Sequence, residues 1–211
     1  MRLKRRRLKE LLSELGKTGM QFGCLNRFNH LMNPKVVELY SEAGFNYFYC
    51  AIEQFDNLAL ASMVKNQKTS QIVQSVNTLH ECGFKLGVSL LYGFEFETEK
   101  SVLATLDFTK EWVDRGLIQL VSESLLSYHP GTAQGKSAEG QRAIAEGFNR
   151  VPPNLGFPWN RCEEGQWYHP SHVTASYVEK VLGWSEERFS DRLIRNRHSW
   201  AYANRAEQYS L

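Results

Sequence analysis

A repeating order of helix, glycine and apolar strand constrains the fold of this chain more than any other feature. Two junctions share the same acidic, small, Gly and Phe residues ahead of an apolar run, in SEAGFNYFYCAIE and HECGFKLGVSLLYG. Gly44, Gly83 and Gly116 each follow a segment with helical spacing of its apolar residues. Nearly continuous apolar strands indicate burial on both faces, which is typical of a parallel sheet covered by helices.

Four apolar runs are the expected strands, and helical patterns lie between them. The runs are MQFGCL, NYFYCAIE, FKLGVSLLYGF and LIQLVSESLLSY. The expected helix starts are Asn33 as a cap with Pro34 in the first turn, Asp56 or Asn57, Thr69 or Ser70, and a position near Glu99. Strands that alternate with helices are joined by right-handed crossovers. The predicted fold class is therefore α/β, with about four parallel strands in an open sheet or an incomplete (β/α) barrel.

The pattern changes after Pro130, where GTAQGKSAEGQ and RVPPNLGFPWN are rich in glycine, proline and small polar residues and predict loops. Two helices are expected after them, at about residues 171–182 and 185–207. We therefore predict a partial barrel over residues 1–135 and a carboxyl-terminal loop and helical extension over residues 136–211.

Composition narrows the class of protein. The chain has 211 residues, of which 42% are hydrophobic and 23% are charged, with a formal net charge of +2. These values exclude a disordered chain and give no argument for nucleic-acid binding from charge alone. No apolar run approaches the roughly 18 residues of a membrane-spanning helix. The four cysteines are widely spaced, so we expect a reducing, cytoplasmic setting and no association with a membrane.

Polar side chains follow the predicted strands at their carboxyl ends, where parallel neighbours would bring them to one rim. The candidate residues are Arg27 after the first strand, Glu53 and Gln54 after the second, Gly93 after the third, and Ser122, Ser124, Tyr128 and His129 on or after the fourth. A guanidinium suits a carboxylate, and a carboxylate suits an amine or ribose hydroxyls. Glycine lets a ligand approach the backbone closely. The rim would therefore suit a zwitterionic ligand that carries a sugar.

Each of these residues also has an ordinary structural interpretation. Arg27 could pair with an outer carboxylate, and Glu53 and Glu97 could be helix caps or first-turn acids. Gly93 and Gly131 could be turn residues. The placement of polar groups at every strand end favours the functional interpretation over these alternatives.

The chain resembles the radical S-adenosylmethionine (SAM) superfamily, specifically the carboxyl-terminal half of its partial barrel in the branch with elongator-type and cobalamin-associated members. The resemblance rests on three ordered segments and covers about residues 18–135. They are LNRFNHLMNPKVVELYSEAGFNYFYCAIEQFDNLALASMVKNQKT, with its Arg, acidic strand end and Met-x-Lys, then HECGFKLGVSLLYGFEFETEKSVLATLDF, and finally VSESLLSYHPGT.

The resemblance implies roles for the candidate residues. Arg27 would meet the carboxylate of S-adenosylmethionine, Glu53 and Gln54 its amine or ribose, and Gly93 with neighbouring backbone its adenine. Ser122 would lie at the cofactor, and Ser124, Tyr128 and His129 would face the substrate. The position of Glu97 in the family often shapes the turn. No metal ligand is expected in this chain.

One hallmark of the family is missing from this sequence. The three cysteines, spaced by three and then two residues, that ligate a 4Fe-4S cluster are absent. The first two strands of the family's barrel also have no counterpart. The cluster supplies the electron that breaks a carbon–sulfur bond of the cofactor, and no side chain replaces it. We expect the chain to be inactive alone, as a split subunit or truncated product, with a partner chain supplying the cluster half, or to form a homo-oligomer.

Two other interpretations stay open at this stage. The chain could be a cluster-free interaction or regulatory protein on a half-barrel scaffold, with RNA contacts through the basic segment at residues 1–9 and an aromatic, Arg-rich tail. It could also be a metal hydrolase that uses histidines, although no recognised ligand spacing supports this. The histidines and carboxylates concerned are His129, His169, His172 and Glu163 or Glu164.

Overall fold

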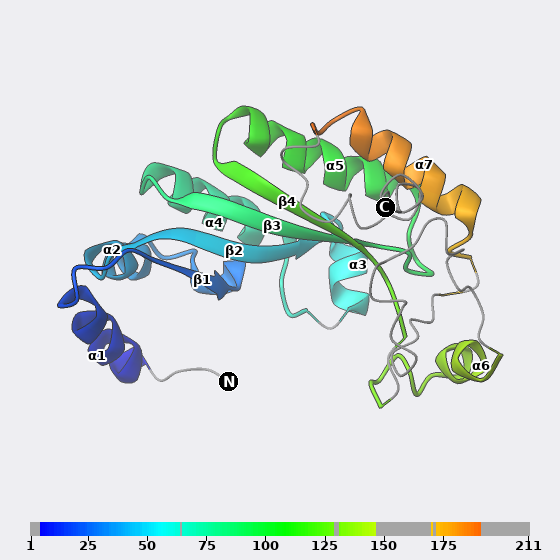
Figure 1. Cartoon of the computed structure of the whole chain (residues 1–211), viewed down its shortest axis with the longest axis horizontal. Helices are drawn as coiled ribbons and strands as arrows, with labels where there is room; N and C mark the ends of the chain where they lie inside the picture. The colour runs from blue at the N-terminus through cyan, green and yellow to red at the C-terminus, as the bar shows by residue number, and fades with distance from the viewer. Residues whose placement is uncertain (1–4, 64, 129–130, 147–169, 171, 191–211) are drawn as a thin grey trace, which may run out of the picture. The chain divides into compact units, whose positions relative to one another are not determined.

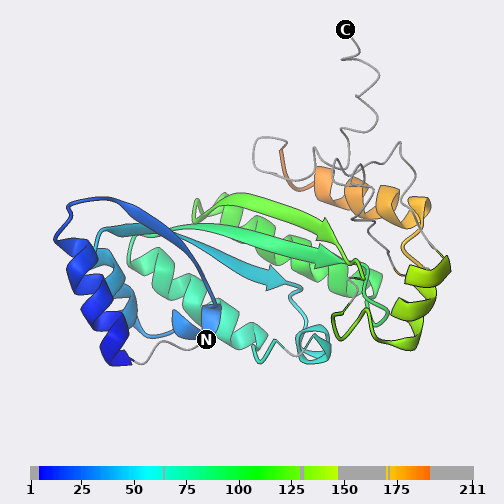
Figure 2. The same cartoon turned by 60° about the horizontal axis from the view of Figure 1, so that its bottom comes forward.

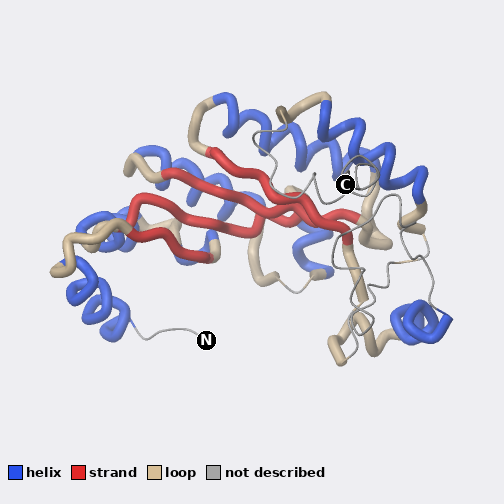
Figure 3. Tube along the Cα trace, in the orientation of Figure 1, coloured by secondary structure: helices blue, strands red, loops and turns tan. Residues whose placement is uncertain are grey.

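Four strands form one sheet in the order β1-β2-β3-β4, which is the order of the chain. The structure is a computed structural model, and it describes residues 5–63, 65–128, 131–146, 170 and 172–190. The strands are β1 (Phe22–Asn26), β2 (Phe45–Glu53), β3 (Lys85–Tyr92) and β4 (Ile118–Leu125). Figure 3 shows these strands alternating with helices along the chain. The sheet is parallel and does not close, so the predicted α/β class with an incomplete barrel is confirmed.

Helices occupy the segments between and around the strands. They are α1 (Arg5–Gly16), α2 (Pro34–Glu42), α3 (Asn57–Ser62), α4 (Thr69–Glu81), α5 (Glu99–Asp114), α6 (Ala138–Glu146) and α7 (Ala175–Glu186), with a short 3-10 helix η1 (Phe28–His30). The chain divides into two compact units. The first unit holds residues 1–89 and 111–120, and the second holds residues 90–110 and 121–211.

The first unit has an apolar layer between its strands and the helices α2 and α4. These two helices lie on the same side of β1 and β2 in Figures 1 and 2. The fully buried side chains of this layer are Phe28, Leu31, Val37, Phe48, Ile52, Ile72, Val76, Leu79, Leu86 and Val88. In the second unit, Leu90, Leu106, Val121 and Val181 are fully buried. The periodicity that predicted the helices thus corresponds to their buried faces.

The expected helix starts agree with the structure at two of three caps. The side chain of Asn33 accepts from the Lys35 backbone N–H at 3.0 Å, and that of Asp56 accepts from the Ala59 N–H at 2.8 Å. The start of α4 differs by one residue, because Lys68 is the capping position and its N–H donates to Gln71 Oε1 at 2.9 Å.

The region after residue 130 differs from its prediction. Residues 131–141, predicted as a loop, contain the start of α6. Ser137 caps that helix by accepting from the Gly140 N–H at 3.0 Å, and a Cβ on Gly140 would lie 2.2 Å from the Gln134 carbonyl oxygen. Glycine is thus required there by packing, although in the sequence it indicates a loop. The helix predicted at about residues 171–182 corresponds to α7, which begins and ends four residues later, and most of the helix predicted at 185–207 lies outside the described residues.

Candidate functional site

The carboxyl ends of β1 and β2 carry two of the predicted site residues. Arg27 directly follows β1, and Glu53 is the last residue of β2. The two strands are parallel, with Asn26 opposite Cys50. Because neighbouring parallel strands end at the same edge, the first unit carries Arg27, Glu53 and Gln54 along one edge of its sheet.

Arg27 is exposed at this edge, and its backbone rather than its guanidinium is fixed. Its N–H donates to Asn26 Oδ1 at 2.8 Å, and the Asn26 amide donates to the Tyr40 hydroxyl at 3.3 Å. Within the described part of the chain, no carboxylate forms an ion pair with Arg27. The described residues thus give no support to the alternative that Arg27 pairs with an outer carboxylate. Its guanidinium is available to an anionic ligand.

Glu53 is held in an uncommon backbone conformation with a charged partner. Its φ is 59°, in the left-handed region that non-glycine residues seldom adopt. Lys65 Nζ lies 2.5 Å from Glu53 Oε1, and the two side chains are 35% and 12% exposed. Glu53 is therefore neither a helix cap nor a first-turn acid, and strain of this kind is often found at functional sites. Lys65 belongs to the Met-x-Lys pattern of the resemblance, but its ion pair with Glu53 was not predicted.

Gln54 is fully buried beside Glu53, and the loop after α3 returns to the same strand. The Gln67 amide donates to the Ala51 carbonyl at 3.4 Å, close to the Lys65–Glu53 pair. The contacts of Lys65 with Glu53 and of Gln67 with Ala51 thus hold residues 65–67 against the end of β2.

In the second unit, Gly93 forms a turn that Glu97 closes. Gly93 has φ of 96°. Its N–H donates to Glu97 Oε2 at 3.1 Å, and the Tyr177 hydroxyl donates to Glu97 Oε1. Burial, and then the nearby Glu97 carboxylate, raise the pKa of Tyr177 above its usual range, so the phenol stays protonated as a donor. This geometry agrees with a turn-shaping role for Glu97.

The other side of Gly93 is occupied by residues that precede and begin α7. His172 Nε2 lies 3.0 Å from the Gly93 carbonyl oxygen. A Cβ on Gly93 would lie 2.7 Å from Val173 Cγ2. The close approach that glycine allows is thus made here by the Val173 side chain of the same chain, and no pattern in the sequence predicts this contact.

β4 presents different residues to its two faces. Ser122 and Ser124 alternate with Glu123, so they lie on the opposite face of the strand. Ser122 is buried and Ser124 is half-buried. Tyr128 is also buried, which raises the pKa of its hydroxyl. His129 lies outside the described residues, and the roles predicted for these four side chains stay predictions.

Glu123 is a fully buried carboxylate with two hydroxyl donors. The Tyr92 hydroxyl donates to Glu123 Oε1 at 2.9 Å, and the Ser185 hydroxyl donates to Glu123 Oε2 at 2.8 Å. Burial and the adjacent carboxylate raise the pKa of Tyr92 well above its usual value. This cluster ties β3, β4 and α7 together within the second unit, and it was not predicted.

The cysteines of the chain do not fit a 4Fe-4S cluster. Cys24, Cys50 and Cys82 are free thiols, and burial raises the pKa of Cys24 to about 11 and that of Cys50 further. Cluster ligation needs thiolates, which these environments disfavour. Cys50 is buried, whereas Cys24 and Cys82 are only partly buried. Cys162 lies outside the described residues.

The described residues contain no group of three or more His, Cys, Asp or Glu side chains that could hold a metal ion. His172 contacts Gly93, while the other members of the hypothetical metal site, His129, His169, Glu163 and Glu164, are outside the described part. In α1, Arg6 pairs with Glu10 at 2.8 Å. Of the aromatic, Arg-rich tail, Trp184 lies on α7, and the other residues lie beyond residue 190, outside the described part. None of the described helices has the length and hydropathy of a bilayer-crossing segment.

The fold resembles solved structures of larger enzymes. The methyltransferase TsrM from Kitasatospora setae, solved with tryptophan and a SAM analogue, matches with a TM-score of 0.63 and 14% identity over 90% of this chain and 42% of TsrM. Elp3 from Methanocaldococcus infernus matches with a TM-score of 0.56 and 9% identity over the same shares of the two chains. At these identities, the likeness concerns the fold alone.

Sequence comparison identifies the family. Bacteriochlorophyllide d C-12(1)-methyltransferase of Chlorobaculum tepidum is 30% identical over 124 residues, which are 58% of this chain and 26% of that protein. The chain thus spans about a quarter of the length of this curated relative. A sequence model of the radical SAM superfamily matches residues 3–109, more than half of the 211 residues. The chain therefore belongs to the radical SAM superfamily.

Proposed function

We propose that this chain is the carboxyl-terminal half of an S-adenosylmethionine-dependent radical enzyme and that the iron–sulfur cluster is held by another polypeptide segment. The observation that carries the proposal is the combination of an exposed Arg27 and a constrained Glu53 at one sheet edge with the lack of any cluster-binding cysteine triplet. Bound to the other segment, the cluster would supply the electron for cofactor cleavage, and this chain by itself would be inactive.

The residues of the first unit suit the polar parts of S-adenosylmethionine. The exposed Arg27 guanidinium can form two parallel hydrogen bonds to a carboxylate. Glu53 keeps one carboxylate oxygen beyond the one that meets Lys65, and it can accept from an amine or a hydroxyl. Gln54 is fully buried beside Glu53, and its role at the amine or ribose stays a prediction. The role of Arg27 is thus to bind and orient the cofactor, and that of Glu53 is to fix its amine or sugar.

The second unit would contribute Gly93 and Ser122 to the cofactor and Ser124, Tyr128 and His129 to the substrate. The positive φ of Gly93 supports its assignment as a position of close approach, although Val173 makes that approach in this structure. Methyl transfer is the reaction that we propose for the complete enzyme, because the curated relative is a methyltransferase.

The first unit also has an exposed sheet edge. β1 is an edge strand of the described sheet, and Leu25 on it is 79% exposed. An exposed edge offers backbone donors and acceptors to a further strand. We propose that a strand of the cluster-binding segment pairs with β1 and covers Leu25.

The experiment measures iron and S-adenosylmethionine binding by the purified chain. Anaerobic reconstitution with iron and sulfide should leave far less than one cluster per chain. Calorimetry should detect S-adenosylmethionine binding that weakens about tenfold or more in Arg27→Ala, because a hydrogen-bonded charge pair contributes roughly 1.5–3 kcal/mol. Arg7→Ala is the matched control, since Arg7 is an exposed cation on α1, and its affinity should equal that of the wild type.

Three outcomes contradict the proposal in different parts. A stoichiometric 4Fe-4S cluster on the isolated chain contradicts the missing cluster half. Equal affinity of Arg27→Ala and wild type contradicts the role of Arg27. Salt-sensitive RNA binding without any affinity for S-adenosylmethionine supports the alternative of a cluster-free interaction protein.

A further inference from the structure

Residues 172–177, called the strap below, fill the space beside Gly93 that its missing side chain leaves open. Val173 is buried, with its Cγ2 only 2.7 Å from the position of a Gly93 Cβ. A carbonyl oxygen can only accept a hydrogen bond, so His172 Nε2 at 3.0 Å carries the proton and donates. Tyr177 adds a bond to Glu97, which itself holds the Gly93 N–H. The strap therefore engages the turn at three points.

The contacts of the strap resemble those that an adenine ring would make. The exocyclic amino group of adenine is a hydrogen-bond donor, like His172 Nε2. A carbonyl oxygen has two lone pairs, so the hydrogen bond alone would not exclude the amino group. The steric limit is the Val173 side chain, because its Cγ2 lies 2.7 Å from the position of a Gly93 Cβ and so occupies that space. A flat ring cannot approach Gly93 from that side while Val173 remains there.

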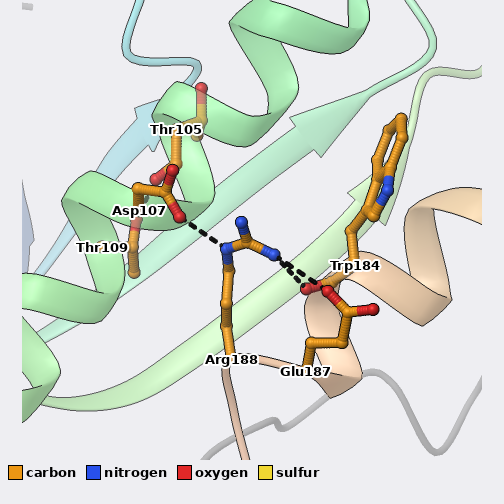
Figure 4. Close-up of polar contacts among 6 residues, drawn as sticks. All are labelled: Thr105, Asp107, Thr109, Trp184, Glu187 and Arg188. Carbon is orange, nitrogen blue, oxygen red and sulfur yellow. Dashed lines mark hydrogen bonds and ion pairs between the residues drawn. The ribbon is translucent and has the colours of Figure 1, made fainter.

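The strap, which includes the first turn of α7, has fewer buried residues than the rest of that helix. His172 is exposed and Tyr177 is half-buried. Further along α7, Val181 and Ser185 are fully buried, and Ser185 donates to Glu123 at 2.8 Å. Just after α7, Arg188 Nε lies 2.7 Å from Asp107 Oδ1 on α5 and its guanidinium also bonds the Trp184 carbonyl, as Figure 4 shows. Local opening begins in the segments with few buried contacts, so we expect the strap to open before the rest of α7.

We propose that the strap is an autoinhibitory contact, which closes the adenine side of the Gly93 turn until a ligand displaces it. The proposal rests on the proposed function, because it takes the Gly93 turn as part of the cofactor site. The apparent dissociation constant of such a site is its intrinsic value divided by the fraction of molecules with the strap open. Weakening the strap should therefore tighten ligand binding.

The test compares S-adenosylmethionine affinities of full-length variants by calorimetry. His172→Ala and Tyr177→Phe each remove one polar contact to the turn and leave the apolar packing of α7 intact. Their combination should bind about fivefold more tightly or better. Lys180→Ala is the matched control, because Lys180 is an exposed residue of the same helix whose ion pair is with Glu99 at the start of α5 and not with Gly93 or Glu97. Its affinity should remain that of the wild type.

Amide hydrogen exchange gives a second readout that tests the competition directly. Added S-adenosylmethionine should protect residues 90–97 of the wild type and at the same time speed exchange in residues 172–178. Protection of both segments would overturn the proposal, because the strap would then be a wall of the site rather than a competitor.

The affinities separate failure of the strap from failure of the proposed function. Equal affinity in wild type, double variant and control overturns the strap alone, and so does weaker binding by the double variant. Lack of S-adenosylmethionine binding by every form overturns the proposed function, and the strap as a competitor with it.

Discussion

Gly44 and Gly83 both have positive φ, 88° and 73°, but their surroundings differ. A Cβ on Gly44 would lie 2.4 Å from the Met20 carbonyl oxygen, while a Cβ on Gly83 would have nothing within 4 Å. The Gly44 carbonyl also accepts from the Phe22 N–H at 2.9 Å, and this hydrogen bond joins the start of β1 to the residue before β2. Glycine is therefore favoured at both positions by the left-handed backbone conformation. At Gly44 it is also required by the close packing against Met20.

Alanine substitutions should separate these two effects. Gly83→Ala should lower the free energy of unfolding by roughly 1–2 kcal/mol, the cost of a left-handed residue with a side chain. Gly44→Ala should lower it further, because a backbone carbonyl cannot move aside without shifting β1. Urea unfolding of both variants measures the difference, and equal losses would show that the contact with Met20 relaxes freely.

The residues of the candidate site were predictable in position but not in partners. Arg27 and Glu53 follow apolar strands, so the pattern alone located them at strand ends. The ion pair of Glu53 with Lys65 depends on how the chain returns after α3, and the alternation of apolar residues carries no information on that return.

At the scale of elements, α7 is attached to the second unit by contacts that the sequence pattern does not predict. It is attached to the rest of the second unit by a buried hydroxyl–carboxylate cluster and by surface ion pairs to α5, beside which it lies in Figures 1 and 2. The surface pairs join side chains that are mostly exposed, such as Lys180 and Glu99 at 56% and 57%. Buried polar contacts contribute more than such pairs.

Ser185→Ala should therefore destabilise the protein by about 1–3 kcal/mol, because it removes a donor from the fully buried Glu123. Lys180→Ala should change stability by no more than about 0.5 kcal/mol. Thermal unfolding of the two variants gives the comparison. A larger loss in Lys180→Ala than in Ser185→Ala would assign the attachment of α7 to its surface pairs instead.

The strands and α2 to α5 were predictable because each has a regular spacing of buried residues and an identifiable cap or glycine. α6 was not, since Ser137 and Gly140 act there as cap and packing residues although the same residue types are typical of loops. The second helix predicted after residue 170 lies largely outside the described residues.

At the scale of the whole molecule, the thiols determine a pH dependence of stability. Burial raises the pKa of Cys24 from 9.0 to about 11, and burial with a contribution from Cys24 raises the pKa of Cys50 further. Between pH 9 and pH 11 the thiols of the unfolded chain release protons that the same thiols retain in the folded chain. Stability is then greatest below about pH 9 and falls as the pH rises toward the folded pKa values.

The urea midpoint of the wild type should thus decrease between pH 8 and pH 10.5, and Cys24→Ala should decrease less over the same range. Cys82→Ala is the control, because that thiol is less deeply buried and should contribute less to the slope. Identical pH profiles for Cys24→Ala and wild type would show that other groups, such as tyrosines and lysines, produce the whole decrease.

The sequence by itself determined the order of the four strands and the helices between them, the strand ends at Arg27 and Glu53, and the lack of a cysteine triplet. Each of these depends only on the spacing of residues that are near one another in the chain. Tertiary structure alone decided that Lys65 meets Glu53 and that His172 meets Gly93, a residue 79 positions earlier in the chain. Spacing specifies which face of an element is buried, whereas the identity of the partner across that face depends on the packing of distant segments.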